Sequence, residues 1–146
     1  MKISKNFRME EFAVSESYPH LVVPVPPYFQ CNVISLVLAV LQPICNASGW
    51  FDIISSGYRN DALNDAVGGS FTSDHRFGRA ADNNFYRIVA GRRQEVPPYE
   101  VAKLVQELKL DYDQMILYPG FVHIGFRVGM NRNMLLYNSS YKGKRL

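Results

Sequence analysis

Two histidines and an aspartate in this sequence have the chemistry needed to bind a metal ion. His75 and Asp82 lie in one short segment, and His123 follows much later in the chain. Two imidazoles and one carboxylate are sufficient for a zinc ion that keeps a fourth position open for water, as a hydrolytic site requires. The spacing alone does not separate such a site from an accidental grouping of these residues.

The residues around His123 alternate strictly between apolar and other types, which predicts a strand with one buried face. His123 must then lie on the opposite face, toward a groove or solvent. A ligand histidine belongs on such a face, although an inert surface histidine fits the pattern as well. The apolar positions are Val122, Ile124, Phe126 and Val128, and the face of His123 also carries Phe121, Gly125 and Arg127.

The segment that joins His75 to Asp82 has to bend if both side chains bind one ion. In an extended chain the two would point to opposite faces, because their separation is odd. Gly78 lies between them, and glycine adopts backbone conformations that other residues avoid. We therefore expect the alternation to break at Gly78.

Three helices are predicted. The first covers 32–48, with Gly49 as its stop and a kink in its last turns at Pro43. A short capped helix is expected over 60–67. The third opens at Pro97-Pro98 and has one apolar face at the i, i+3, i+4, i+7 spacing. That face consists of Val101, Leu104, Val105 and Leu108.

Strands are predicted over 50–55, 80–89, 114–118 and 121–128, with Pro119-Gly120 as the turn between the last two. The last two strands therefore form an antiparallel hairpin. Early and late helices combined with such a hairpin indicate an α+β fold, in which helices pack on one face of a small antiparallel sheet.

Composition indicates one domain over 1–146, since 146 residues with 47% hydrophobic residues bury one sizeable core. Residues 129–146 are predicted to be a basic C-terminal extension. The net charge of +3 owes much to this tail and to Arg92-Arg93, which fit either an anionic partner or solvated surface charge. We favour the solvated interpretation, so nucleic acid is not an expected partner.

The apolar run 33–44 is shorter than the roughly 20 residues that span a bilayer, so we expect a buried helix and no membrane span. The basic segment 1–8 has no apolar stretch behind it, which predicts no secretory signal and a cytoplasmic protein as synthesised. Cys31 and Cys45 would be roughly 20 Å apart along a helix, too far for a disulfide. Both are predicted to be small core residues.

Several motifs together resemble the zinc D-Ala-D-Ala carboxypeptidases, a metallopeptidase family with the Hedgehog/DD-peptidase fold. The similarity extends over most of 7–128. Small family members without a signal peptide are carried by bacterial viruses, so the resemblance implies host cytoplasm or virion as the location. The motifs are Glu11-Phe12, Leu41-Gln42-Pro43, Ser56-Gly57-Tyr58-Arg59, Asn64, Val67-Gly68-Gly69, the pattern S-x-H-x-x-G-x-A-x-D from Ser73 to Asp82, and Val122-His123-Ile124.

The resemblance implies one zinc ion per chain, bound by His75, Asp82 and His123. It places Arg59 beside the metal, where a guanidinium stabilises the oxyanion of the tetrahedral intermediate. Arg59 bonding loop carbonyls is the alternative. Ser73 either contacts the substrate or holds the loop.

The sequence departs from the family at the general base. Family members have a glutamate shortly before the last histidine, and the segment 112–122 contains none. Tyr118 or Pro119 takes that place. A two-residue turn puts Tyr118 on the face of His123 and Asp113 on the other face. A tyrosine with a pKa of about 10 is a poor base, which leaves Asp113 and Glu107 as the nearest carboxylates in sequence.

Two functions therefore remain. The first is a zinc-dependent peptidoglycan peptidase that trims D-Ala-D-Ala or cuts stem peptides with a metal-activated water. The second is a non-catalytic zinc-containing module that binds wall peptides or a protein partner, for which the missing glutamate is the sign.

Overall fold

Six strands form one mixed sheet in the computed structural model, which describes residues 1–146. All neighbouring pairs are antiparallel except β4 and β6, which are parallel. The α+β prediction is confirmed, and the predicted antiparallel sheet gains one parallel strand. The order is β1 (Phe51–Ser56), β2 (Ala80–Val89), β5 (Phe121–Gly125), β4 (Gln114–Tyr118) and β6 (Met134–Tyr137), with β3 (Arg92–Glu95) paired to β2.

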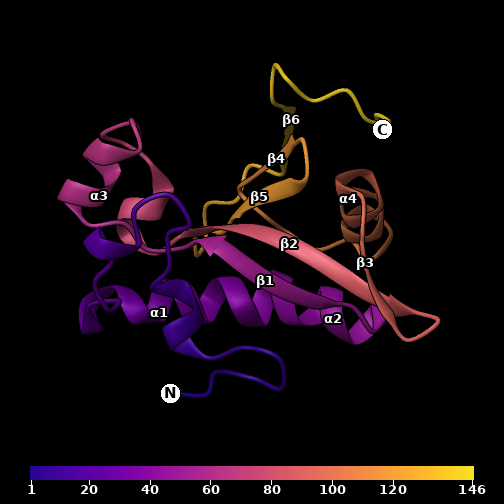
Figure 1. Ribbon diagram of the computed structural model, residues 1–146, viewed down its shortest axis with the longest axis horizontal. Coiled ribbons are helices and arrows are strands. Elements are labelled where there is room, and N and C mark those ends of the chain that lie inside the picture. The colour runs from indigo at the N-terminus through magenta and orange to yellow at the C-terminus, as the bar shows by residue number, and fades with distance from the viewer.

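A long helix lies across one face of this sheet (Figure 1). It starts at Pro27 and not at 32, because a proline fits the first helical turn, where no N–H is needed. The Asn32 amide instead donates to the carbonyl of Phe77 at 2.8 Å. The helix comprises α1 (Pro27–Leu36), the π-helical η3 (Val37–Leu41) and α2 (Gln42–Ser48).

Pro43 disturbs this helix as predicted, but one turn earlier. Since Pro43 has no N–H, the helical ladder loses a donor, and η3 directly before it has π-type hydrogen bonding. Gly49 ends the helix with a φ of 77°, the left-handed conformation that glycine accepts without strain.

By length and composition the 22 residues of Pro27–Ser48 form the one helix long and apolar enough to cross a membrane. In the fold, however, its apolar stripe is buried in the core, which is typical of a core helix. Helix α4 (Pro98–Glu107) adds Val101 and Val105 to the same core. The stripe consists of Val33, Leu36, Val37, Val40, Leu41 and Ile44.

Three residues that the sequence places in the core are exposed. Cys31 lies on the outer side of α1, whereas Cys45 is buried, and both are free thiols. Leu108 follows the last residue of α4, so the helical spacing no longer applies to it. Val128 is exposed because β5 ends at Gly125 and the strand alternation stops there.

Residues 129–146 contribute β6 and a packed tyrosine. Tyr141 is buried, and its ring centroid lies 5.5 Å from that of Tyr137. Lys142, Lys144 and Arg145 are exposed. The prediction of a solvated tail therefore holds for these cations and is wrong for Tyr141.

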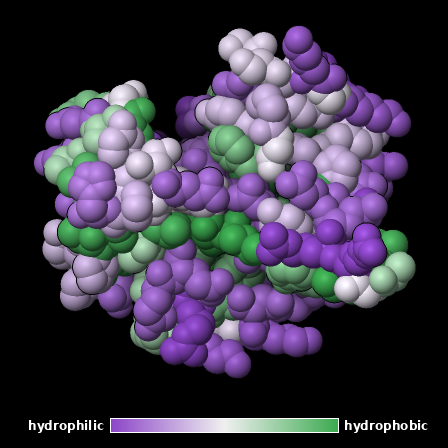
Figure 2. Space-filling view, viewed as in Figure 1, coloured by the Kyte–Doolittle hydropathy of each residue, from purple (hydrophilic) through white to green (hydrophobic).

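The other face of the sheet carries a cleft. One wall consists of the loop that follows α3 (Asp61–Ala66) and the 3-10 turn η4 (Asp74–Phe77), and strands β4 and β5 form the other. Asn60 caps α3 by accepting from the N–H of Leu63, which confirms the predicted short helix. Figure 2 shows a notch at the top of the molecule between the two parts, with hydrophilic side chains around it.

Candidate metal centre and substrate cleft

The structure brings His75, Asp82 and His123 together at the bottom of the cleft. One ligand atom from each lies within 4.8 Å of the others. Asp82 Oδ1 is 3.0 Å from His123 Nδ1 and 3.3 Å from His75 Nε2. The ring centroids of the histidines are 5.1 Å apart. Three elements, a 3-10 turn and two strands, thus meet at one point.

Strand pairing explains half of this convergence. Asp82 on β2 is directly opposite His123 on β5, so both side chains project from the same face of the sheet. His75 arrives from η4, a 3-10 turn that ends at Gly78 with a φ of 67°. The expected break at Gly78 is therefore present, and the preceding residues are helical rather than extended.

A backbone carbonyl fixes the orientation of the His75 ring. His75 Nδ1 donates to the Gly57 carbonyl at 2.8 Å, which leaves the lone pair of Nε2 facing Asp82. Gly57 is needed for a close approach, since a Cβ there would be 2.3 Å from the carbonyl oxygen of Phe12 in η1 (Met9–Phe12). The carbonyl of His75 accepts from the N–H of Arg59 at 3.0 Å.

The protonation states of these residues suit a metal ion. Burial lowers the pKa of His75, which favours the neutral ring that metal ligation requires. Burial raises the pKa of Asp82, but the neighbouring His75 and His123 outweigh it, and the net pKa is well below the ordinary value. Two imidazole nitrogens and an ionised carboxylate are a donor set that fits zinc with one position left for water.

Arg59 lies next to the ligands. Its Nη2 is 3.8 Å from Asp82 Oδ2, while Nε donates to Ser56 Oγ at 3.3 Å and Nη1 to Asn64 Oδ1 at 3.5 Å. Gly69 leaves space for this arrangement, since a Cβ there would lie 2.1 Å from Asn64 Oδ1. Side chains, and not the loop carbonyls of the alternative prediction, therefore hold the guanidinium.

Ser73 lines the cleft and also begins η4. Its hydroxyl accepts from the N–H of His75 at 3.3 Å, so it holds the turn that carries the ligand. This contact supports the loop-holding alternative for Ser73.

Tyr118 lies on the face of His123, as the turn geometry predicts. Tyr118 pairs with Phe121 across Pro119-Gly120, and the two rings stack with centroids 4.4 Å apart. Burial raises the pKa of Tyr118, and Asp82 adds to the effect, so the phenol stays protonated. At neutral pH Tyr118 is therefore a protonated phenol, which can donate a hydrogen bond but is a poor base.

Neither carboxylate that is nearest in sequence reaches the centre. Asp113 is fully buried and pairs with Arg132, whose Nε and Nη2 are each 2.9 Å from a carboxylate oxygen, and with Arg127 at 3.3 Å. Glu107 lies on α4 and lines a different hollow beside Trp50. The structure therefore contradicts both as neighbours of the metal ligands.

Asp74 is a cleft residue that sequence reasoning missed. Its Oδ1 accepts from Arg127 Nη2 at 2.8 Å, and a Cβ on Gly125 would lie 3.7 Å from its Oδ2. The available signal was the position of Asp74 next to the ligand His75 in the sequence. Asp74 and Asp82 are the two acidic residues that line the cleft.

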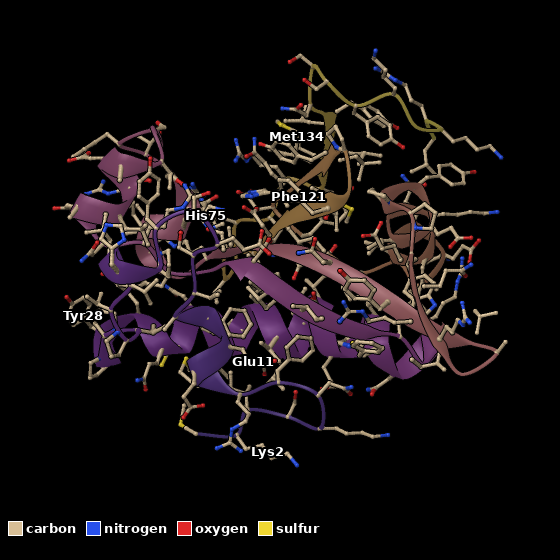
Figure 3. All side chains as sticks on the ribbon, viewed as in Figure 1. Lys2, Glu11, Tyr28, His75, Phe121 and Met134 are labelled. Carbon is tan, nitrogen blue, oxygen red and sulfur yellow. The ribbon has the colours of Figure 1, made fainter.

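The cleft has a volume of about 660 Å³ and a mostly polar lining. Figure 3 shows His75 and Phe121 on its two sides. Along β4, Gln114, Ile116 and Tyr118 form one wall, with Ile116 opposite His123. A polar cleft beside a cation and a set of metal ligands suits a peptide backbone.

A set of metal ligands beside an arginine in a polar cleft is typical of metal-dependent peptidases. The family model described as Peptidase M15 matches residues 5–125, so the chain belongs to this family of zinc-dependent metallopeptidases. The match covers every ligand and all of the sheet except β6. No curated protein matches the chain.

Proposed function

We propose that the protein is a zinc-dependent peptidoglycan peptidase, either a D-Ala-D-Ala carboxypeptidase or a stem-peptide endopeptidase. The observation that carries the proposal is the convergence of His75, Asp82 and His123 beside Arg59 in a polar cleft. When bound, zinc would supply an acidified water and a Lewis acid for the scissile carbonyl.

The other residues act on the substrate. The guanidinium of Arg59, which lies close to the ligand Asp82, would stabilise the negative charge that develops on the carbonyl oxygen in the transition state. The protonated hydroxyl of Tyr118 adds a second donor from the opposite wall. Hydrogen bonds from Arg59 to Ser56 and Asn64 hold the guanidinium in position before the substrate binds.

The alternative, a non-catalytic zinc-containing module that binds wall peptides or a protein, is favoured by one observation. The glutamate that the family uses as base is absent, and the one cleft carboxylate outside the ligand set, Asp74, is paired with Arg127. The two functions differ in what happens to a bound peptide.

Both are tested by incubating the zinc-loaded protein with purified peptidoglycan and with a synthetic peptide ending in D-Ala-D-Ala. Release of D-alanine indicates a carboxypeptidase, and new amino groups within stem peptides indicate an endopeptidase. His123→Ala is the control. Bound zinc and bound peptide without cleavage would instead support the module.

A further inference from the structure

A second groove lies beside the metal cleft. The first turn of α4, the β4–β5 turn and the C-terminal tail enclose a volume of about 660 Å³. In Figure 1 the tail runs from β6 toward α4. Its lining includes Tyr99, Glu100, Tyr118, Ser140, Tyr141 and Lys144.

The groove adjoins the cleft. Tyr118 lines both, so the groove is within reach of a substrate that extends past the metal centre along β4. The metal centre binds one segment of the peptide. The groove would therefore receive the portion of the substrate that follows this segment.

The tail is folded against the domain and forms a built wall. Parallel pairing of β6 with β4 positions it, and Tyr141 is buried with its hydroxyl donating to the carbonyl of Lys144. Lys144 Nζ lies 5.0 Å from the ring centroid of Tyr99. This wall, 140–144, lies outside the family match over 5–125, so it belongs to the extension of this chain.

We propose that the groove binds the N-acetylated amino sugars of the peptidoglycan glycan strand, an inference that rests on the proposed peptidase function. A sugar ring has a C–H face that packs on tyrosine rings and a rim of hydroxyl and acetamide groups that needs polar partners. Tyr99 and Tyr118 supply the rings, and Ser140, Glu100 and Lys144 supply donors and acceptors.

Covalent connection favours this occupant over others. Every stem peptide of peptidoglycan is attached to a glycan strand, so a peptide in the cleft brings sugars close to the groove. A groove lined by tyrosine and proline also resembles the sites that bind proline-rich peptides. Recognition of a proline-rich peptide does not require a neighbouring metal centre. Binding of such a peptide is therefore the competing outcome of the test.

The experiment titrates the zinc-free protein with a tetramer of N-acetylglucosamine that carries no peptide, followed by NMR. We expect saturable binding, weakened about tenfold or more by Tyr99→Ala, the scale of one lost aromatic contact. Tyr28→Ala is the matched control, because Tyr28 is an exposed tyrosine at the far end of the molecule (Figure 3). It should bind as the wild type does.

A second variant keeps the test independent of the stability of α4. Ser140 is exposed and lines the groove, so Ser140→Trp should fill it and block the sugar without removing a core contact. With zinc restored, Tyr99→Ala should lose its preference for a disaccharide-linked peptide over the free peptide while cutting the free peptide within about twofold of the wild type.

No saturable sugar binding by the wild type, equal weakening by Tyr28→Ala, or tighter binding of a proline-rich peptide would each overturn the inference. Because the titration needs neither zinc nor turnover, sugar binding by an inactive protein would contradict the peptidase function and leave the groove assignment standing.

Discussion

The two faces of β5 are organised by different physical rules. Val122 and Ile124 lie in a continuous apolar core, where any side chain of similar volume and shape would serve. On the other face, His123 contacts one specific polar partner from a separate strand, Asp82, with Nδ1 and Oδ1 3.0 Å apart. The core face therefore sets stability, whereas the cleft face depends on the identity of each side chain.

The largest effect should come from His123→Ala. Loss of one of the three protein ligands should reduce bound zinc from about one equivalent per chain to less than about a tenth, and peptidase activity with it. The fold should persist, because the core face of the strand is untouched. Metal analysis and circular dichroism measure the two effects.

Ile124→Ala is the matched change on the opposite face. It should lower the free energy of unfolding by about 2–5 kcal/mol through loss of buried volume, while the folded fraction keeps its zinc. Urea unfolding of both variants compares them. If His123→Ala unfolds the protein and Ile124→Ala does not, the assigned roles of the two faces are reversed.

Arg59→Ala should reduce turnover by about 100-fold to 1000-fold, the scale of one lost oxyanion donor, with zinc content unchanged. Steady-state kinetics on the cleavable peptide measure it. Asn64→Ala removes a contact of Arg59 and should cause a smaller loss, about 10-fold. Equal turnover of Arg59→Ala and wild type would remove Arg59 from the mechanism.

Tyr118→Phe should cost at most about 10-fold to 100-fold in turnover, since one hydrogen bond is lost and no base is removed. Tyr118→Glu places a carboxylate on the face of His123 and is expected to raise the activity of a feeble wild type. A fully active wild type, combined with a Tyr118→Glu variant that loses activity, would show that the base comes from elsewhere.

The smallest effect concerns Asp113. Hydrogen bonds from Arg132 lower the pKa of Asp113 in the folded protein, so its contribution to stability is present above the unfolded pKa of about 3.9 and is lost as pH falls through the folded value. Asp113→Asn should be less stable than wild type at pH 7, and the difference should shrink below about pH 4. Urea titrations at both pH values test this, and a constant difference would contradict it.

Local patterns in the sequence predicted much of the fold. The alternation of apolar residues predicted the core face of β5. The Pro-Gly dipeptide predicted the register of the hairpin, and Gly49 predicted the end of the long helix. The sequence patterns missed β3 and β6, two strands of four residues each. The start of α1 and the exposure of Val128 depend on how far each element extends, which propensity does not fix. Cys31 is exposed because it lies on the outer side of α1.

The sequence alone determined which side chains were available for the site, namely two histidines, an aspartate and a nearby arginine, because ligand chemistry resides in residue types. Only the tertiary structure decided which of these side chains lie together. The pairing of β2 with β5 placed Asp82 opposite His123, η4 brought Asp74 into the cleft, and Glu107 lies at a different hollow. Alternation is a property of one strand, whereas the choice of neighbouring strand is made between distant segments by burial of the whole core.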